Sequence, residues 1–64
     1  MKAEQFDYVV KVNGYKGKGI TAARLVAVNG FTYAKAGEMS GCTKSAAHAA
    51  LLRVWDAHAR IYGE

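Results

Sequence analysis

The chain has 64 residues, a formal net charge of +4 and 52% hydrophobic residues. This length fits one small domain, residues 1–64, and leaves no room for a linker and a second domain. Twelve of the hydrophobic residues are alanines, which bury little surface each. We therefore expect a stability of only a few kcal/mol, and oligomerisation is a reasonable expectation.

Composition also bears on the compartment. Cys42 is the only cysteine, so an intrachain disulfide is excluded and a reducing compartment is the simpler assumption. No apolar run approaches the roughly 20 residues that a membrane span requires. The first eleven residues place acids and Lys11 where a signal peptide would be apolar. We therefore expect a cytoplasmic protein with no membrane contact.

The basic residues are concentrated in the middle of the chain. Between Tyr8 and Trp55 there is one acid, Glu38, against seven basic residues: Lys11, Lys16, Lys18, Arg24, Lys35, Lys44 and Arg53. A basic centre suits a polyanionic partner, because neutralising phosphates releases condensed counterions. Small basic domains also occur without such a partner, so charge alone leaves nucleic-acid binding undecided.

Residues 4–12 fit two secondary structures. Phe6, Val9 and Val10 are spaced for one face of a helix, and Asn13-Gly14 is a good helix stop. The same segment is rich in β-branched and aromatic residues, and Asn-Gly is also the strongest hairpin signal. The residues alone leave helix and strand about equally supported.

Residues 14–19, GYKGKG, predict a flexible basic loop. They lack the G-x-x-x-x-G-K-[ST] pattern and the strand–helix frame of a phosphate-binding loop, so we reject nucleotide binding. The largely apolar segment 20–28 predicts a buried central helix, which Asn29-Gly30 ends. Thr32 or a neighbour then begins the next helix.

The stretch that follows is the most informative in the chain. A short helical segment, Tyr33 to Met39, is broken by Ser40-Gly41-Cys42, and a long helical pattern runs from Thr43 to about Tyr62. Glycine adopts the left-handed conformation that ends a helix, and threonine is a good N-cap. Two helices joined by such a turn form the unit that places its second helix in a DNA major groove. We predict a helix-turn-helix over about residues 32–55 with a long C-terminal recognition helix.

At 100° per residue, the last helix carries three groups of residues, and Leu52 belongs to two of them. The predicted core stripe consists of Ala47, Ala50, Leu51, Val54, His58 and Ile61. Roughly opposite, in the first three turns, lie the residues that a recognition helix would present: Lys44, Ser45, His48, Ala49 and Leu52. A second apolar edge, which the first helix may or may not cover, is the predicted dimer interface: Leu52, Trp55, Ala59 and Tyr62.

Small residues indicate where helices cross closely. The positions expected to need close backbone approach are Ala36, Gly37, Gly41 and Ala47. Ser40, just before the turn, is polar where such motifs usually carry an apolar residue, and we expect Met39 to fill that space.

Several short motifs then carry a resemblance to a known family. They are Gly41-Cys42-Thr43-Lys44, Arg53-Val54-Trp55, an early Gln5-Phe6, Ala23-Arg24 and Asn29-Gly30. In this order and spacing, without gaps over about residues 4–56, the chain resembles the TrfB/KorA group of plasmid transcriptional repressors. The resemblance implies an all-helical DNA-binding domain, favours helix for residues 4–12, and implies a repressor that recognises a short palindrome as a dimer. With residues 4–12 taken as a helix, we predict an all-α bundle of about four helices that contains the helix-turn-helix and the long C-terminal recognition helix.

Two site residues follow from the resemblance by position. Lys44 matches a basic residue with which such repressors read bases. Ala49 matches a position where the founding members carry a base-reading glutamine. This departure argues against a shared operator.

The residues themselves also indicate roles in a DNA complex. Lys44 can donate to guanine or simply meet a phosphate, and His48, one turn later, can donate to guanine or contact a thymine methyl. Ser45 can contact DNA, and Ala49 can only meet a methyl group or permit close approach. Thr43 is more suited to capping than to a phosphate. Candidates for backbone contacts are Thr43, Tyr33, Lys35, Arg53, Lys16 and Lys18, although Arg53 could instead support Asp56 across a helical turn.

Other chemistries find little support. Cys42, His48 and His58 supply three ligands at best and lack paired metal-ligand spacing, so we predict neither metal nor cofactor. His58 is better explained as a partly buried core histidine and Cys42 as a small apolar plug. No nucleophile–base–acid grouping can be defended, so we do not expect an enzyme.

The sequence leaves three hypotheses for the partner. The first is a dimeric repressor of a plasmid or phage that binds a palindromic double-stranded operator. The second is a small phage or plasmid factor that uses the same scaffold to bind and inhibit a host protein. The third is a nucleoid-type protein without sequence preference, which would show a steep dependence of affinity on salt.

Overall fold

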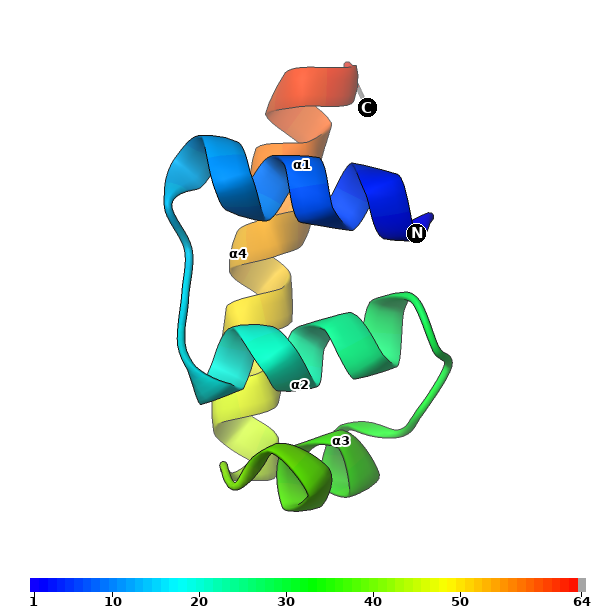
Figure 1. Cartoon of the computed structure of the whole chain (residues 1–64), viewed down its shortest axis with the longest axis vertical. Helices are drawn as coiled ribbons and strands as arrows, with labels where there is room; N and C mark the ends of the chain where they lie inside the picture. The colour runs from blue at the N-terminus through cyan, green and yellow to red at the C-terminus, as the bar shows by residue number, and fades with distance from the viewer. Residues whose placement is uncertain (64) are drawn as a thin grey trace.

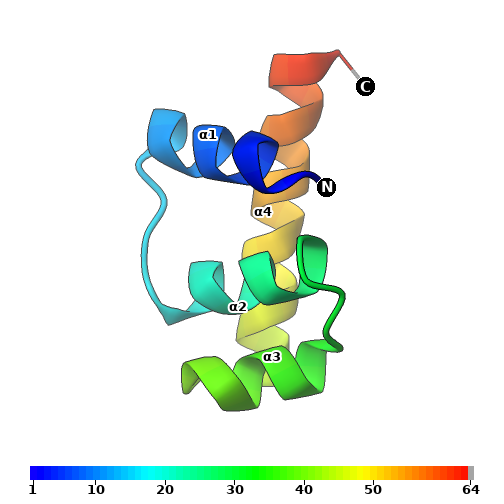
Figure 2. The same ribbon diagram turned by 45° about the vertical axis from the view of Figure 1, so that its right-hand side comes forward.

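The computed structural model describes residues 1–63 and contains four α-helices in this range. They are α1 (Ala3–Asn13), α2 (Lys18–Ala27), α3 (Tyr33–Ser40) and α4 (Lys44–Tyr62). In Figures 1 and 2, α1, α2 and α3 lie one above another on the same side of α4, and each crosses it. The predicted all-α bundle of four helices with a long last helix is confirmed. The opposite side of α4 is left without a covering helix.

Side-chain caps and glycines set the ends of α3 and α4. The Oγ1 atom of Thr32 accepts a hydrogen bond from the Lys35 amide at 3.1 Å, and that of Thr43 accepts one from the Ala46 amide at 3.0 Å. Gly41 has φ +74°, and the hydrogen bond from the Cys42 amide to the Gly37 carbonyl closes α3 as a Schellman motif. The predicted caps and the predicted break between these helices are therefore present.

Residues 4–12 are helical. Phe6 and Val9, three residues apart, are both buried, whereas Tyr8 and Val12 on the other side of α1 are exposed. Gly14 ends α1 in the left-handed conformation. The helical spacing of the buried residues, and not the β-propensity of the segment, therefore decides its structure.

The central helix begins earlier than the sequence indicates. The predicted basic loop, residues 14–19, ends at Gly17, and Lys18 and Gly19 form the first turn of α2. A Cβ at Gly19 would lie 3.2 Å from the Ala50 Cβ and 3.3 Å from the Ala46 carbonyl oxygen of α4. Glycine thus allows this first turn to pack closely on α4, which periodicity alone does not reveal.

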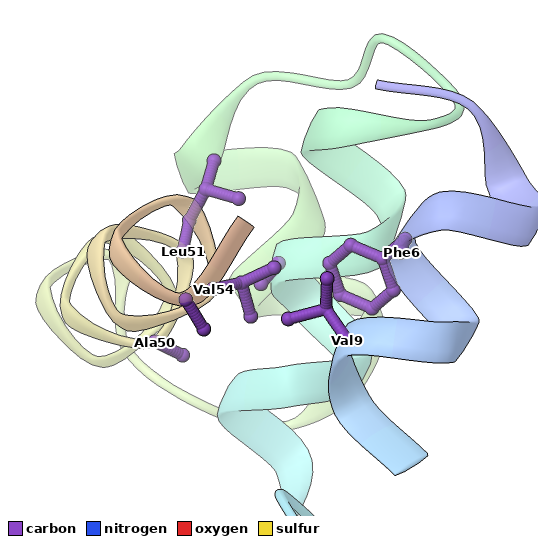
Figure 3. Close-up of a cluster of buried hydrophobic side chains, with 7 residues drawn as sticks. Phe6, Val9, Ala50, Leu51 and Val54 are labelled. Carbon is purple, nitrogen blue, oxygen red and sulfur yellow. The ribbon is translucent and has the colours of Figure 1, made fainter. Parts of the chain in front are cut away.

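Two groups of buried side chains hold the helices together. The larger group joins α1 and α2 to α4, and Figure 3 shows Phe6 and Val9 of α1 pointing toward Val54 of α4. The smaller group consists of one alanine from each of α2, α3 and α4, and none of the three is exposed: Ala22, Ala36 and Ala47. We call this group the alanine junction.

Three details of the predicted core are wrong. Ile61 is 38% exposed, because α4 continues past α1, whereas Ala57 is buried and was not predicted. Met39 is 52% exposed and does not replace Ser40, which is itself half-buried. His58 is buried more fully than expected, at 6% exposure.

None of the helices within residues 1–63 is long and apolar enough to cross a membrane.

Candidate nucleic-acid interface

The turn between α3 and α4 is held by a close backbone contact. A Cβ added to Gly37 would lie 2.8 Å from the Cys42 carbonyl oxygen and 3.2 Å from the Thr43 carbonyl oxygen. Any larger side chain at Gly37 would therefore push the turn away from α3. Gly41 differs, because an added Cβ there meets only the end of the Lys18 side chain, at 3.8 Å. Its positive φ, and not crowding, is what requires glycine at that position.

The first two turns of α4 present an exposed surface, as the sequence predicts. The four predicted base-contacting residues are all exposed: Lys44, Ser45, His48 and Ala49. Thr43 is also exposed, but its hydroxyl caps α4, in agreement with the duty preferred for it. No acidic residue lies in the first turn of α4. The positive end of the helix dipole is therefore uncompensated beside this surface.

The beginning of α3 borders one flank of this surface. The rings of Tyr33 and His48 meet edge to face with centroids 5.0 Å apart. Lys35, in the same first turn as Tyr33, is exposed and takes part in no ion pair within residues 1–63. The predicted backbone-contacting residues Tyr33 and Lys35 thus lie next to the predicted base-contacting His48.

The beginning of α2 borders the opposite flank, as the arrangement in Figure 1 shows. An open hollow of about 270 Å³ lies beside the contact between this end of α2 and α4. Its lining includes two of the predicted backbone-contacting residues and one predicted base-contacting residue: Lys16, Arg53 and Ala49. Lys18 lies beside the turn at Gly41. Four predicted residues are therefore gathered around this hollow and the turn.

Neither of the two ion pairs in the described part of the chain involves a basic residue near the beginning of α4. Within residues 1–63, Arg24 pairs with Asp7 at 2.9 Å and Arg60 pairs with Asp56 at 3.1 Å. The alternative role for Arg53, support of Asp56, is therefore wrong. Asp56 pairs with Arg60, and the Arg53 guanidinium lies 5.9 Å from the ring centroid of Tyr15.

The hydrogen bond from Arg24 holds the pKa of Asp7 below its ordinary value of 3.8.

The other part of α4 carries the predicted dimer interface, which the first helix leaves largely uncovered. Leu52, Trp55 and Tyr62 are exposed, and Ala59 is half-buried. Trp55 and Tyr62 also pack on the buried His58 ring, at centroid distances of 5.2 Å and 4.6 Å. This edge is therefore an exposed apolar surface whose two aromatic rings are both packed against the buried His58 ring.

Sequence reasoning missed several participants. The Tyr15 ring lies near the Arg53 guanidinium and Ile20 lines the hollow, although neither residue belongs to α4. His58 Nε2 lies 3.3 Å from Gln5 Oε1 of α1, while His58 Nδ1 has no partner in the described structure. Apart from the family resemblance, the only local signal for this contact is a polar residue next to a buried phenylalanine in the sequence.

Among the described side chains, no three of His, Cys, Asp or Glu gather closely enough to hold a metal ion. Comparisons of the chain with models of known protein families, with curated proteins and with solved structures found no significant match.

Proposed function

We propose that this chain is a sequence-specific double-stranded DNA-binding regulator that inserts the beginning of α4 into the major groove. The observation that carries the proposal is the exposed surface of Lys44, Ser45, His48 and Ala49, with basic residues on both of its flanks. A helix in the major groove meets base edges along its exposed side and a phosphate strand on either flank. In this chain, basic residues likewise lie on both flanks of the exposed surface of α4.

The residues divide into two roles in the proposed complex. Lys44 and His48 donate hydrogen bonds to acceptors such as guanine O6 and N7, and Ser45 contacts DNA beside them. The small Ala49 lets the helix approach the bases closely. Phosphates of one strand meet Tyr33 and Lys35, and those of the other strand meet Lys16, Lys18 and Arg53.

The proposed biological setting follows from the family resemblance. We propose that the protein acts as a repressor in the cytoplasm of a cell that carries a plasmid or phage, as TrfB/KorA-like repressors do. The support is the ungapped series of motifs along residues 4–56. The operator of this protein differs from that of the founding members, because Ala49 cannot make the hydrogen bonds of a glutamine.

The first experiment is selection of binding sites from a pool of random duplexes at ~150 mM salt, followed by sequencing. Recovery of a defined motif supports the proposal. Binding that shows no motif and fades with salt contradicts it and favours a nucleoid-type protein.

Two variants with the same change in charge then test the surface. We expect Lys44→Ala to weaken binding to the selected site by about 10- to 100-fold, because a base contact contributes about 1–3 kcal/mol. Lys11→Ala removes the same charge from the exposed side of α1 and serves as the control. Equal losses in the two variants would indicate a general effect of charge and would contradict base reading by Lys44.

A second candidate function is binding of a host protein, favoured by the exposed Leu52, Trp55 and Tyr62. Lys44→Glu separates the two functions. This variant should lose DNA binding if α4 enters the groove, and it should keep a protein partner that docks on the apolar edge.

A further inference from the structure

The exposed apolar edge of α4 has an internal symmetry. Its four residues are separated by three, four and three positions: Leu52, Trp55, Ala59 and Tyr62. This is the spacing of the a and d positions of a coiled coil, which keeps a seam of side chains on one side of a helix. The spacing reads the same in both directions, and its centre lies at position 57.

We propose that a second copy of this chain docks on this edge, with the two α4 helices antiparallel. An antiparallel pair centred at position 57 brings Trp55 of one copy opposite Ala59 of the other, and Leu52 opposite Tyr62. The largest side chain of the edge then meets the smallest, so that both rings find space. The same patch on both copies forms the contact, as a two-fold interface requires.

Charge beside the edge is compatible with a second copy. Asp56 and Arg60 follow the edge on one side and form an ion pair within each chain at 3.1 Å. This ion pair has no net charge on either copy, so it does not make the two copies repel each other. In the antiparallel pair, Asp56 of one copy lies as close along the helices to Arg60 of the other copy as to its Asp56, so each arginine can offset the approach of the two carboxylates. By contrast, the beginning of α4 is surrounded by lysines and would repel its own copy.

The antiparallel arrangement also spaces the two proposed DNA-binding surfaces, a step that rests on the proposed function. Each such surface is centred near residue 46, which is eleven residues from the centre of the pair. At 1.5 Å per residue, the two surfaces lie about 33 Å apart along the helices. Two half-sites one turn of DNA apart are separated by about 34 Å. A parallel pair would instead place the two surfaces side by side.

Sedimentation analysis over micromolar to millimolar concentrations tests the docking surface. We expect the wild-type chain to form dimers and Leu52→Glu to raise the dimer dissociation constant at least about tenfold, because the contact would bury an unpaired charge. Val12→Glu is the matched control, since Val12 is 56% exposed and Leu52 is 55% exposed. Monomeric wild-type protein throughout this range, or equal effects of the two substitutions, would overturn the proposal.

Cross-linking tests the direction of the pair in chains that carry Cys42→Ser. One chain carries Leu52→Cys and the other carries Tyr62→Cys, and a bifunctional thiol reagent much shorter than 15 Å joins them. Positions 52 of the two copies lie about 15 Å apart in the antiparallel pair, as do positions 62. We expect cross-linked dimers only in the mixture of both chains. Cross-linking of either chain alone would indicate a parallel pair and overturn the proposal. Circular dichroism checks that each variant remains helical.

The two proposals fail in different ways. A dimer that selects no DNA motif would retain this interface and refute the proposed function. A monomer that still selects a single half-site would refute this interface and retain the proposed function.

Discussion

In the first half of α4, residues 44–50, the packed side chains are alanines, whereas in the second half, residues 51–62, they include Leu51, Val54 and His58. The first half contacts α2 and α3 through the alanine junction and the close approach of Gly19, and Gly37 of α3 approaches the turn just before it. The second half contacts α1 through Phe6 and Val9.

The two halves of α4 therefore have different effects on the positions of the helices and on the stability of the fold. A buried alanine methyl contributes on the order of 0.8 kcal/mol, whereas a buried valine, leucine or phenylalanine side chain contributes about 1.5–3 kcal/mol. The alanine junction therefore adds little stability, but it fixes the helices at short distance. The proposed DNA-binding surface lies on the half that is fixed in position, and most of the apolar stabilisation comes from the other half.

The largest expected effect is the loss of a large side chain beside the second half of α4. Phe6→Ala should destabilise the chain by about 3–5 kcal/mol, through lost burial and the cavity that remains. A domain of this size has only a few kcal/mol in total, so most molecules should be unfolded at 25 °C. Urea titration followed by circular dichroism measures this effect.

A matched pair sharpens this comparison. Tyr8→Ala removes an aromatic ring from the exposed side of the same helix and should have a small effect. In the alanine junction, Ala47→Gly should cost only about 1–2 kcal/mol, from one methyl group and the lower helix propensity of glycine. If Ala47→Gly were as destabilising as Phe6→Ala, the division between the two halves would be wrong.

A smaller effect is expected from adding one methyl group near the turn. Gly37→Ala would place a Cβ 2.8 Å from a backbone oxygen. The overpacking costs about 1–3 kcal/mol, and the better helix propensity of alanine returns about 1 kcal/mol. Gly19→Ala gains the same propensity against a less severe contact of 3.2 Å, so we expect a smaller loss of stability there than in Gly37→Ala.

Gly37→Ala also tests whether the close contact at this turn holds the beginning of α4 in position. Under the proposed function, Gly37→Ala should weaken DNA binding even where the protein is fully folded, because the turn before α4 is displaced from α3. Measurements of the urea midpoint and of DNA affinity separate the two effects. Wild-type stability together with wild-type affinity in Gly37→Ala would show that this close approach constrains nothing.

The smallest effect concerns the ion pair that joins α1 to α2. Folding lowers the pKa of Asp7 through its hydrogen bond from Arg24. Its stabilisation is therefore present above the pKa of the unfolded state and is lost as the pH falls through the lower folded pKa. We expect Asp7→Asn to be slightly less stable than wild type at pH 7 and equal to it in acid. A difference that persists at low pH, or that salt does not weaken, would contradict this origin.

The sequence allowed the ends of α3 and α4 to be predicted because caps depend on neighbouring residues. Thr43 accepts its hydrogen bond from an amide only three positions away, and glycine ends helices by its own conformational freedom. The exposure of Lys44 and His48 also followed from periodicity. Residues 4–12 could not be assigned locally, because only the burial of Phe6 and Val9 against α4 distinguishes helix from strand.

The remaining errors have tertiary causes. Ile61 lies at a core position of the helical repeat, but no helix crosses α4 at that level. The partner of Arg53 depends on where the chain before α2 passes, since Tyr15 lies 38 positions earlier in the sequence. Which flank of α4 receives each basic residue was likewise unpredictable until the helices were arranged in space.

The crossing of α1, α2 and α3 over one common helix has a consequence for synthesis of the protein. All three lie before α4 in the chain, and both groups of buried side chains include residues of α4. A nascent chain that still lacks α4 therefore has no complete core, and the short helices are too short to be stable alone. Folding must await translation of the last helix, and a chain interrupted before it would remain a substrate for proteases.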